Sequence, residues 1–158
     1  MMDVLNELTN GTISTWFISP LLDMSTTISG SFYTRTLMTG RPDRMYVRYS
    51  TAGWSSNVGN TPDSIGDFTN QLLAINPSLS VIGYPNTWTK YTFSIPARGA
   101  GITGRIAFHY YVTNAGPLTA NGYMIGIDTL NINANKVCDT TSTASTSNYC
   151  LFIMFINM

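Results

Sequence analysis

Few residues of this 158-residue chain have side chains suited to catalysis or metal binding. His109 is the only histidine, so the chain can build neither a Ser-His-Asp triad with a second base nor a multi-histidine metal site. Cys138 and Cys150 lack the CxxC spacing and the second pair of a structural zinc site. They either form a disulfide, which would close a Thr/Ser-rich loop, or stay free thiols. The sequence therefore predicts a protein that is not an enzyme.

Aromatic side chains offer a second kind of chemistry, because their faces can pack against the apolar faces of sugar rings. Trp16 and Trp88 fall within expected strands, where we expect burial in the core. Trp54 lies instead in a loop of residues 51–56. A tryptophan in an exposed loop indicates a contact surface, so Trp54 is the candidate ligand-contact residue.

The charge balance excludes several classes of partner. The chain has 8 Lys+Arg and 8 Asp+Glu, and only 10% of its residues are charged, against about 25% in an average domain. Nucleic acid and anionic lipid are not expected as partners, since both need clustered Lys and Arg. The acidic N-terminus shows no signal peptide. The longest apolar run, residues 151–156, is far below the ~20 residues of a membrane-spanning helix.

Hydrophobic residues alternate with the period of β-strands. We therefore expect strands, and the turns between them, to position the candidate site residues. Met45, Val47 and Tyr49 share one face of residues 44–50. Residues 104–113 repeat the pattern, with Phe108 and Tyr110 expected inward and His109 expected outward on the surface. Further strands are expected at residues 12–19, 31–37, 87–95 and 123–132, separated by Gly, Pro and Asn turns.

One segment, residues 67–75, fits either a short helix or an edge strand, because Phe68, Leu72 and Ile75 also fall on one helical stripe. Elsewhere no window favours helix. Short strands joined by tight turns within one domain predict an all-β fold, a two-sheet antiparallel β-sandwich of jelly-roll type.

Several sequence blocks, in order, resemble the bacterial choice-of-anchor J domain, a relative of the cleaved-adhesin and MAM-like jelly rolls. They include residues 11–20, 31–36, 42–50, 83–91 and 104–117. The resemblance covers about residues 11–132. It implies a β-sandwich on exported or surface-attached proteins, adhesion-like and without enzymatic activity, in which residues 67–75 form an extended edge strand.

Two departures from the family pattern define the expected organisation. The strand that family domains place before residue 11 is not evident, so residues 1–132 form a β-sandwich lacking it. Residues 133–158 replace the family's anchoring signal with an extension that holds the two cysteines and an apolar end. We expect this extension to pack on the same domain or on a neighbouring subunit.

Because related jelly rolls often hold a structural Ca²⁺, the carboxylates are candidate calcium ligands. Asp43, in the turn after residue 40, and Asp128, on the last expected strand, are the best candidates, with Asp63 and Asp67 as loop alternatives. The alternative roles are an Asx-turn or arginine partner for Asp43 and a strand-end hydrogen bond for Asp128. No carboxylate pair suited to glycoside hydrolysis is evident.

The apolar end is the candidate assembly strand. It contains Leu151, Phe152, Ile153 and Phe155, with no charge and no proline, which is the profile of an aggregation-prone strand if left exposed. It has to be covered. It either folds back within the chain, as a replacement for the missing strand or as a simple terminal core strand, or adds to the sheet edge of a neighbouring subunit.

Together these features predict a non-catalytic extracellular or surface module for adhesion or subunit assembly. Its expected partners are further copies of itself or other surface and structural proteins. The first alternative is a structural protein of a virion or filament, and the second is a carbohydrate-binding module that uses Trp54. The expected locations are accordingly the extracellular space, the cell surface or a virion particle.

Overall fold

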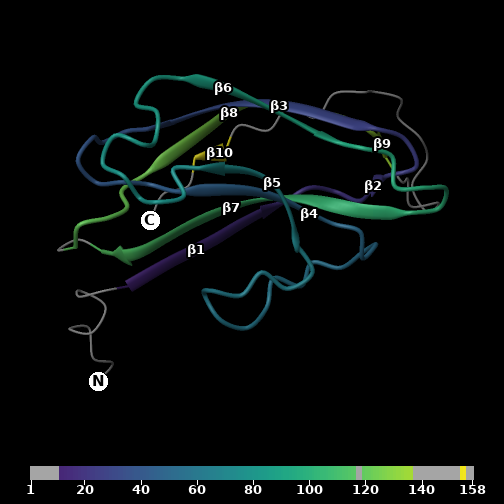
Figure 1. Cartoon of the computed structure of the whole chain (residues 1–158), viewed down its shortest axis with the longest axis horizontal. Coiled ribbons are helices and arrows are strands. Elements are labelled where there is room, and N and C mark those ends of the chain that lie inside the picture. Colours follow the sequence, from purple (N-terminus) through teal and green to yellow (C-terminus); the bar gives the residue numbers. More distant parts are fainter. Residues whose placement is uncertain (1–10, 117–118, 137–153, 156–158) are drawn as a thin grey trace.

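The computed structural model describes residues 11–116, 119–136 and 154–155, and within them all regular structure is strand (Figure 1). The expected all-β class is confirmed. Among these residues no helix is long and apolar enough to cross a membrane. Cys138, Cys150, Leu151, Phe152 and Ile153 lie outside the described residues.

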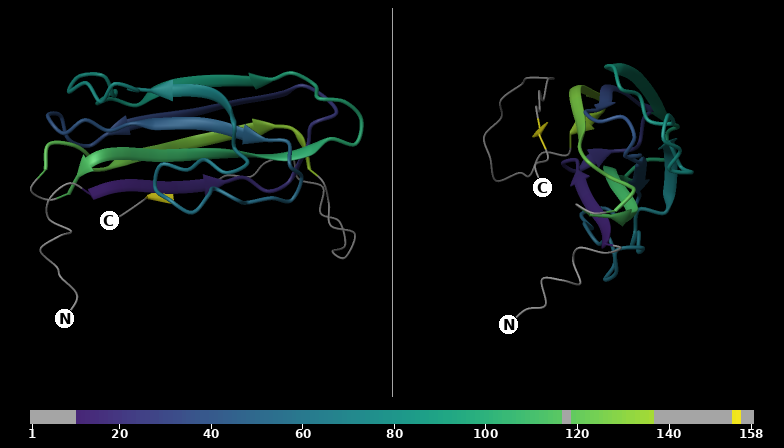
Figure 2. Two further views of the ribbon diagram at one scale, coloured as in Figure 1. Left: turned by 60° about the horizontal axis from the view of Figure 1, so that its bottom comes forward. Right: turned by 90° about the vertical axis from the view of Figure 1, so that its left-hand side faces the viewer.

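The strands form two sheets that lie face to face, as Figure 2 shows. The first sheet has the order β5 (Asn70–Ile75), β4 (Met45–Ser50), β7 (Thr103–Ala115), β2 (Leu22–Asp23) and β9 (Asn135–Lys136), with β1 (Gly11–Ile18) also beside β7. The second sheet has the order β10 (Met154–Phe155), β8 (Ile125–Asn133), β3 (Ile28–Thr36) and β6 (Thr89–Ile95). All pairings between named strands are antiparallel. The predicted two-sheet antiparallel β-sandwich is therefore confirmed.

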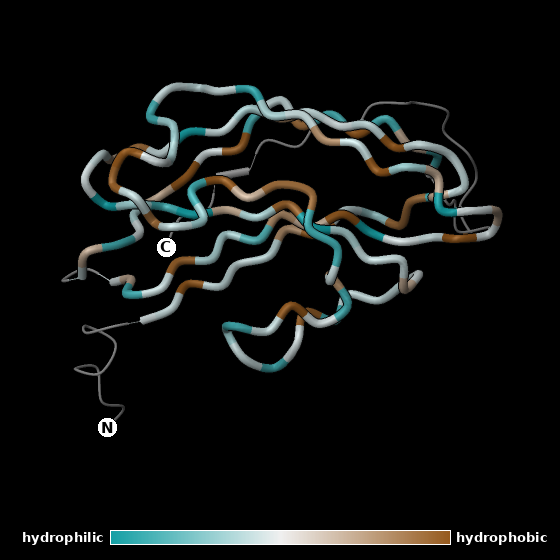
Figure 3. The backbone as a smooth tube through the Cα atoms, viewed as in Figure 1, coloured by the Kyte–Doolittle hydropathy of each residue, from teal (hydrophilic) through white to brown (hydrophobic). Residues whose placement is uncertain are grey.

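The core lies between the sheets and follows the alternation expected from the sequence, visible as brown positions along the strands in Figure 3. Met45 and Val47 of β4 stand opposite Tyr110 and Phe108 of β7, and all four are buried. From the second sheet, Phe32 meets Phe108 edge-on, with ring centroids 5.1 Å apart. Facing apolar positions from the two sheets thus make one continuous core.

Residues 67–75 end in the edge strand β5, so the edge-strand alternative is correct and the helix is not. Asp67 and Phe68 belong to the β4–β5 connection, and the strand begins at Asn70. A bulge beside Leu72 shifts the pairing between Val47 and Arg48 of β4. A β-bulge takes successive residues out of strict alternation, so the apolar residues of β5 do not keep a regular period of two.

The expected surface position of His109 is wrong. Its alternation is as predicted, since it points away from the core that Phe108 and Tyr110 enter, but its side chain is only 2% exposed. Trp16 of β1 stacks on the imidazole with centroids 3.7 Å apart, and Phe68 packs on Trp16. Phe68 comes from the β4–β5 connection, which lies outside the first sheet in Figure 1. A long connection thereby buries a position that strand alternation alone places in solvent.

The end of the chain meets the second sheet. Met154 and Phe155 pair with Ile127 and Gly126 of β8. Within the described residues, Met154 and Phe155 thus lie at the edge of the second sheet rather than beside β1.

Candidate functional site

Exposed hydrophobic side chains gather at one end of the sandwich. Three segments meet there through backbone hydrogen bonds, Thr36 N to Pro85 O, Leu37 N to Met124 O and Gly122 N to Pro42 O. These segments are the β3–β4 connection, the β5–β6 connection and the approach to β8. We call their exposed apolar side chains the loop-end patch, which comprises Leu37, Met38, Val81, Ile82 and Tyr123.

A fully buried carboxylate, Asp43, holds these segments together. The Thr36 hydroxyl donates to its Oδ2 at 2.6 Å, and the Tyr110 hydroxyl and the Tyr123 amide donate to its Oδ1 at 2.5 and 3.0 Å. Hydrogen bonds to a charged acceptor are about twice as strong as neutral ones. Asp43 therefore fixes the ends of β3 and β7 and the approach to β8 relative to one another.

The side chain of Asn76 fixes the connection that carries Val81 and Ile82. Its Nδ2 donates to Asp43 O at 2.8 Å and to Ser80 O at 2.9 Å, and its Oδ1 accepts from Ser80 N at 2.8 Å. Its backbone has φ 54°, a left-handed conformation that asparagine tolerates better than most residues. Ile82, 91% exposed, is thus presented by a loop whose turn is tied to the core network.

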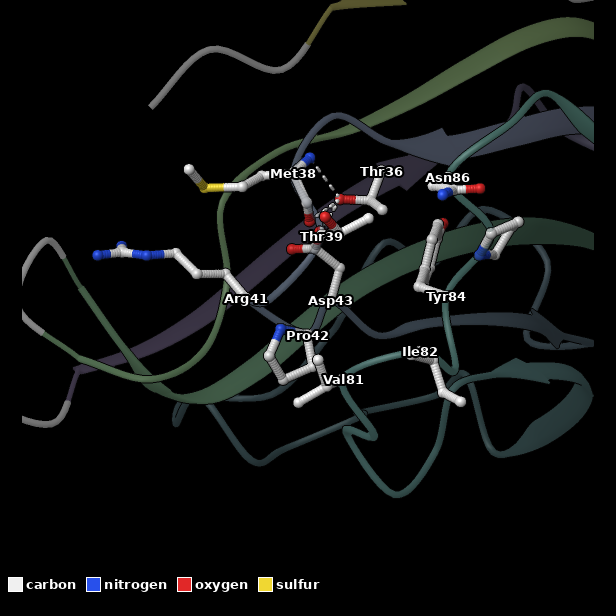
Figure 4. A pocket seen from close by; sticks show the side chains of 11 residues that line it. Thr36, Met38, Thr39, Arg41, Pro42, Asp43, Val81, Ile82, Tyr84 and Asn86 are labelled. Atoms are coloured by element: carbon white, nitrogen blue, oxygen red, sulfur yellow. Dashed lines mark hydrogen bonds between the residues drawn. The ribbon is translucent and has the colours of Figure 1, made fainter.

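A hollow of about 160 Å³ opens between these segments (Figure 4). Its lining includes Thr36, Met38, Asp43, Val81, Ile82 and Tyr84. Burial raises the pKa of the Tyr84 phenol above its ordinary value, so this hydroxyl stays neutral and hydrogen-bonded to Thr34 at 2.7 Å. The hollow is thus lined by both polar and apolar side chains.

The four candidate calcium ligands all take part in hydrogen bonds. The carboxylate of Asp43 accepts from the Thr36 and Tyr110 hydroxyls and from the Tyr123 backbone amide. Asp128 lies opposite Tyr33 and accepts from Thr129 N, a local hydrogen bond on its strand. Asp63 accepts from the Tyr111 hydroxyl and Asp67 from the Ser55 hydroxyl. Within the described part of the chain, no three metal-binding side chains come together.

The outer face of the first sheet carries a second cluster, which we call the arginine–tyrosine stack. It alternates Tyr111, Arg44, Tyr46 and Arg48. The Arg44 guanidinium lies 4.5 Å from the ring centroid of Tyr111 and 5.6 Å from that of Tyr46, and Arg48 lies 4.9 Å from Tyr46. Each guanidinium is thus held within cation–π range of at least one ring.

His109 lies beside this stack with one nitrogen unpartnered. Its Nε2 is 3.0 Å from the Ser14 hydroxyl oxygen, and its Nδ1 has no hydrogen-bond partner. Burial, together with the charges of Arg48 and Arg44, lowers the pKa of His109 to about 3. The imidazole is therefore neutral near pH 7, and within the described residues no carboxylate orients it as in a catalytic triad.

The three tryptophans occupy unlike positions. Trp54 is 62% exposed, as expected for a loop contact residue, and the Arg105 guanidinium lies 5.7 Å from its ring. The expected core burial of the other two is wrong. Trp88 is 44% exposed and lies over Gly126, where a Cβ atom would come within 2.8 Å of the indole. Trp16 covers His109 on the outer face.

The sequence interpretation missed Asn76 and Ile82 as site residues. Asn76 is followed by Pro77, a turn signal, but its hydrogen bond to Asp43 joins residues distant in sequence. Arg44, Tyr46 and Arg48 alternate along the chain with the buried Met45 and Val47. Their stacking with Tyr111 depends on β4 pairing with β7.

Comparison with known proteins gives one similar fold. No protein-family model matches the chain, and no curated protein matches it significantly. A solved structure, the K1 cleaved adhesin domain of Lys-gingipain from Porphyromonas gingivalis W83, is similar with a TM-score of 0.46 and 22% identity. The match covers 76% of this chain and 63% of that one, less than two thirds of its length. It concerns the fold and assigns no family.

Proposed function

We propose that this β-sandwich is a non-catalytic module for adhesion or subunit assembly, on the outside of a cell or a particle, and that the loop-end patch is where it contacts further copies of itself. One observation carries the proposal. The exposed apolar side chains of three segments distant in sequence gather at one end of the sandwich, around Met38 and Ile82.

The energetics of the patch favour a contact role. Burying a side chain such as Ile82 in an interface contributes about 2 kcal/mol from its apolar area. Hydrogen bonds of Asp43 and Asn76 already hold the supporting backbone, so little ordering entropy is lost on binding. An exposed aliphatic side chain on a fixed loop is therefore a favourable anchor for a protein contact.

The charge balance supports contact between copies. A formal net charge of zero leaves no net repulsion between two identical chains, and proteins near zero charge associate most readily. Subunits of a virion or a filament, the first alternative from the sequence, would use the same kind of contact. The proposal therefore covers both a cell-surface and a particle setting.

The state of His109 supports a non-catalytic role. A general base works best with a pKa near the operating pH, whereas the pKa of this imidazole is lowered to about 3. Among the residues that the structure describes, no carboxylate contacts Nδ1 of His109 in the Ser14–His109 pair. A neutral, poorly basic histidine would be a weak activator of the Ser14 hydroxyl.

Sedimentation velocity across a wide range of concentration tests the proposal. We expect the wild type to associate and Ile82→Asp to weaken that association by about 10-fold or more, because a charge at a buried contact has to be desolvated. Ile102→Asp is the matched control, since Ile102 is exposed (37%) at the opposite end, beside the start of β7. A wild type that stays monomeric, or equal effects of the two variants, would contradict contact through this end.

A further inference from the structure

The Arg48 guanidinium on the outer face of the first sheet has unused hydrogen-bonding capacity. Its Nε is buried without a partner, and within the described residues the group makes no hydrogen bond or ion pair. A guanidinium offers about five N–H donors in a plane. The Tyr46 ring lies against it, which restricts its orientation while its donors remain unpaired. Such a group is suited to bind a carboxylate through two parallel hydrogen bonds.

A second buried nitrogen on the same face also lacks a partner. His109 stands opposite Tyr46, and Arg48 stands opposite Ala107, two residues along β7. The Nδ1 of the fully covered His109 has no hydrogen-bond partner. Buried polar atoms are almost always hydrogen-bonded, so two such atoms close together are unusual. The two unpartnered nitrogens mark one region of the outer face.

The neighbouring arginine makes this region positive and rigid. Arg44 donates from Nε to Tyr111 O at 2.8 Å and from a terminal nitrogen to Pro77 O at 3.1 Å, so its position is fixed. No carboxylate within the described residues pairs with Arg44 or Arg48. Both guanidiniums flank the same Tyr46 ring. An anion placed beside Arg48 would therefore meet two positive charges that form no ion pair within the described residues.

The border of this face carries groups that suit hydroxyls. Gln71 stands opposite Arg48 on β5 and is exposed. Asp63, also exposed, accepts from the Tyr111 hydroxyl and has further acceptor capacity on its carboxylate. A polyanion such as nucleic acid would be repelled by Asp63 and would need a wider basic surface. A ligand with one acidic group and several hydroxyls matches these groups.

We propose that the outer face of the first sheet binds an acidic sugar, a carbohydrate unit that carries a carboxylate. The Arg48 guanidinium binds the carboxylate, the Tyr46 and Tyr111 side chains border the sugar, and Asp63 and Gln71 accept or donate hydrogen bonds to its hydroxyls. This site is separate from the loop-end patch and does not depend on self-association.

Isothermal titration of the full chain with paired probes tests the assignment. Sialyllactose is compared with lactose, and trigalacturonic acid with its methyl ester, so each acidic sugar has a neutral counterpart. We expect at least one acidic probe to bind, its neutral counterpart to bind at least about 10-fold more weakly, and added salt to weaken binding. Which acid binds distinguishes a sialic from a uronic source. Binding of neither acidic sugar, or equal binding of acid and neutral forms, would overturn the proposal.

Three variants locate the site. Arg48→Gln should weaken binding by about 10-fold to 100-fold, the loss expected for a bidentate charged pair. Arg48→Lys keeps the charge and the aliphatic stem, so it preserves the fold and should give a smaller loss. Arg98→Gln removes one equal charge from an exposed position after β6 and should leave affinity unchanged. An equal loss in Arg98→Gln, or full affinity in both Arg48 variants, would contradict an Arg48 site.

Discussion

Successive residues of β7 enter two different environments. Phe108 and Tyr110 point between the sheets, where aromatic and aliphatic side chains surround them and the Tyr110 hydroxyl donates to the buried Asp43. His109 and Tyr111 point outward, where they meet Trp16, Tyr46 and two arginines. His109 is as buried as its core neighbours. At these three positions the two faces are buried to a similar degree, but they differ in the side chains that surround each residue.

This difference separates a face that holds the fold together from one with unused interaction capacity. The buried carboxylate of the inner face has a donor on each oxygen, whereas unpartnered buried nitrogens of the outer face belong to Arg48, Arg105 and His109. Unpaired buried polar groups reduce stability, so a fold retains them at some cost. Substitutions at four consecutive positions of β7 can test this contrast.

Phe108→Ala should have the largest effect. Its ring lies between Phe32, at 5.1 Å, and Phe17, at 5.9 Å, so truncation leaves a cavity and should lower the free energy of unfolding by about 4 kcal/mol. Urea denaturation followed by tryptophan fluorescence measures the loss. Phe108→Leu, which keeps most of the volume, should cost far less. If the alanine variant lost less than about 1 kcal/mol in the free energy of unfolding, the result would contradict core packing of Phe108.

Tyr110→Phe should rank second. It removes the hydroxyl that donates to Asp43 Oδ1 and should cost about 2 to 3 kcal/mol, because the acceptor is a buried charge. Burial and the Asp43 carboxylate raise the pKa of Tyr110, so the hydroxyl remains a donor well into the alkaline range. Tyr49→Phe is the control, since Tyr49 is buried on β4 and its hydroxyl forms no hydrogen bond within the described residues. Equal losses in the two variants would contradict a specific role for the Tyr110–Asp43 bond.

His109 should give the outer face a pH dependence. Its pKa is lowered from 6.5 to about 3 in the folded chain, so below the unfolded value the unfolded state binds a proton that the folded state does not. Stability should therefore fall by about 2 kcal/mol between about pH 7 and pH 5 and continue to fall toward the folded value. Chemical denaturation at several pH values measures the slope. His109→Gln should remove it over this interval, and a slope that persists in the variant would assign it to other groups.

Tyr111→Phe should have the smallest effect. It removes the hydroxyl that donates to the exposed Asp63 but keeps the ring beside Arg44. A hydrogen bond open to water contributes little, so we expect a change of about 0.5 kcal/mol or less in the free energy of unfolding. The same denaturation measurement applies. A loss as large as that of Tyr110→Phe would mean that the outer face stabilises the fold as strongly as the inner face.

Most of the fold was predictable from local pattern. The alternation of Met45, Val47 and Tyr49, and of Phe108 and Tyr110, identified the inward faces of β4 and β7, because strand side chains alternate with period two whatever their partners. Two short strands, β2 and β9, were missed, since a pair of residues carries no periodic signal.

The site was predictable only in part. Trp54 was expected to be exposed because it lies in a loop, and it is. His109 was placed in solvent because nothing in its own segment indicates that Trp16 and Phe68 cover it. The hydrogen-bonding role of Asp43 could not be predicted, because its donors, Thr36, Tyr110 and Tyr123, come from three different segments.

The sequence by itself determined the strands, the turns and which side chains share a face, because these follow from backbone geometry and from the period of the hydrophobic pattern. Only the tertiary structure decided what covers each face and which polar groups find partners. Register and loop placement bring Arg44 and Arg48 against Tyr46 and Tyr111, and the same packing leaves His109 buried without a partner for Nδ1. Such contacts depend on segments distant along the chain, so no local pattern encodes them.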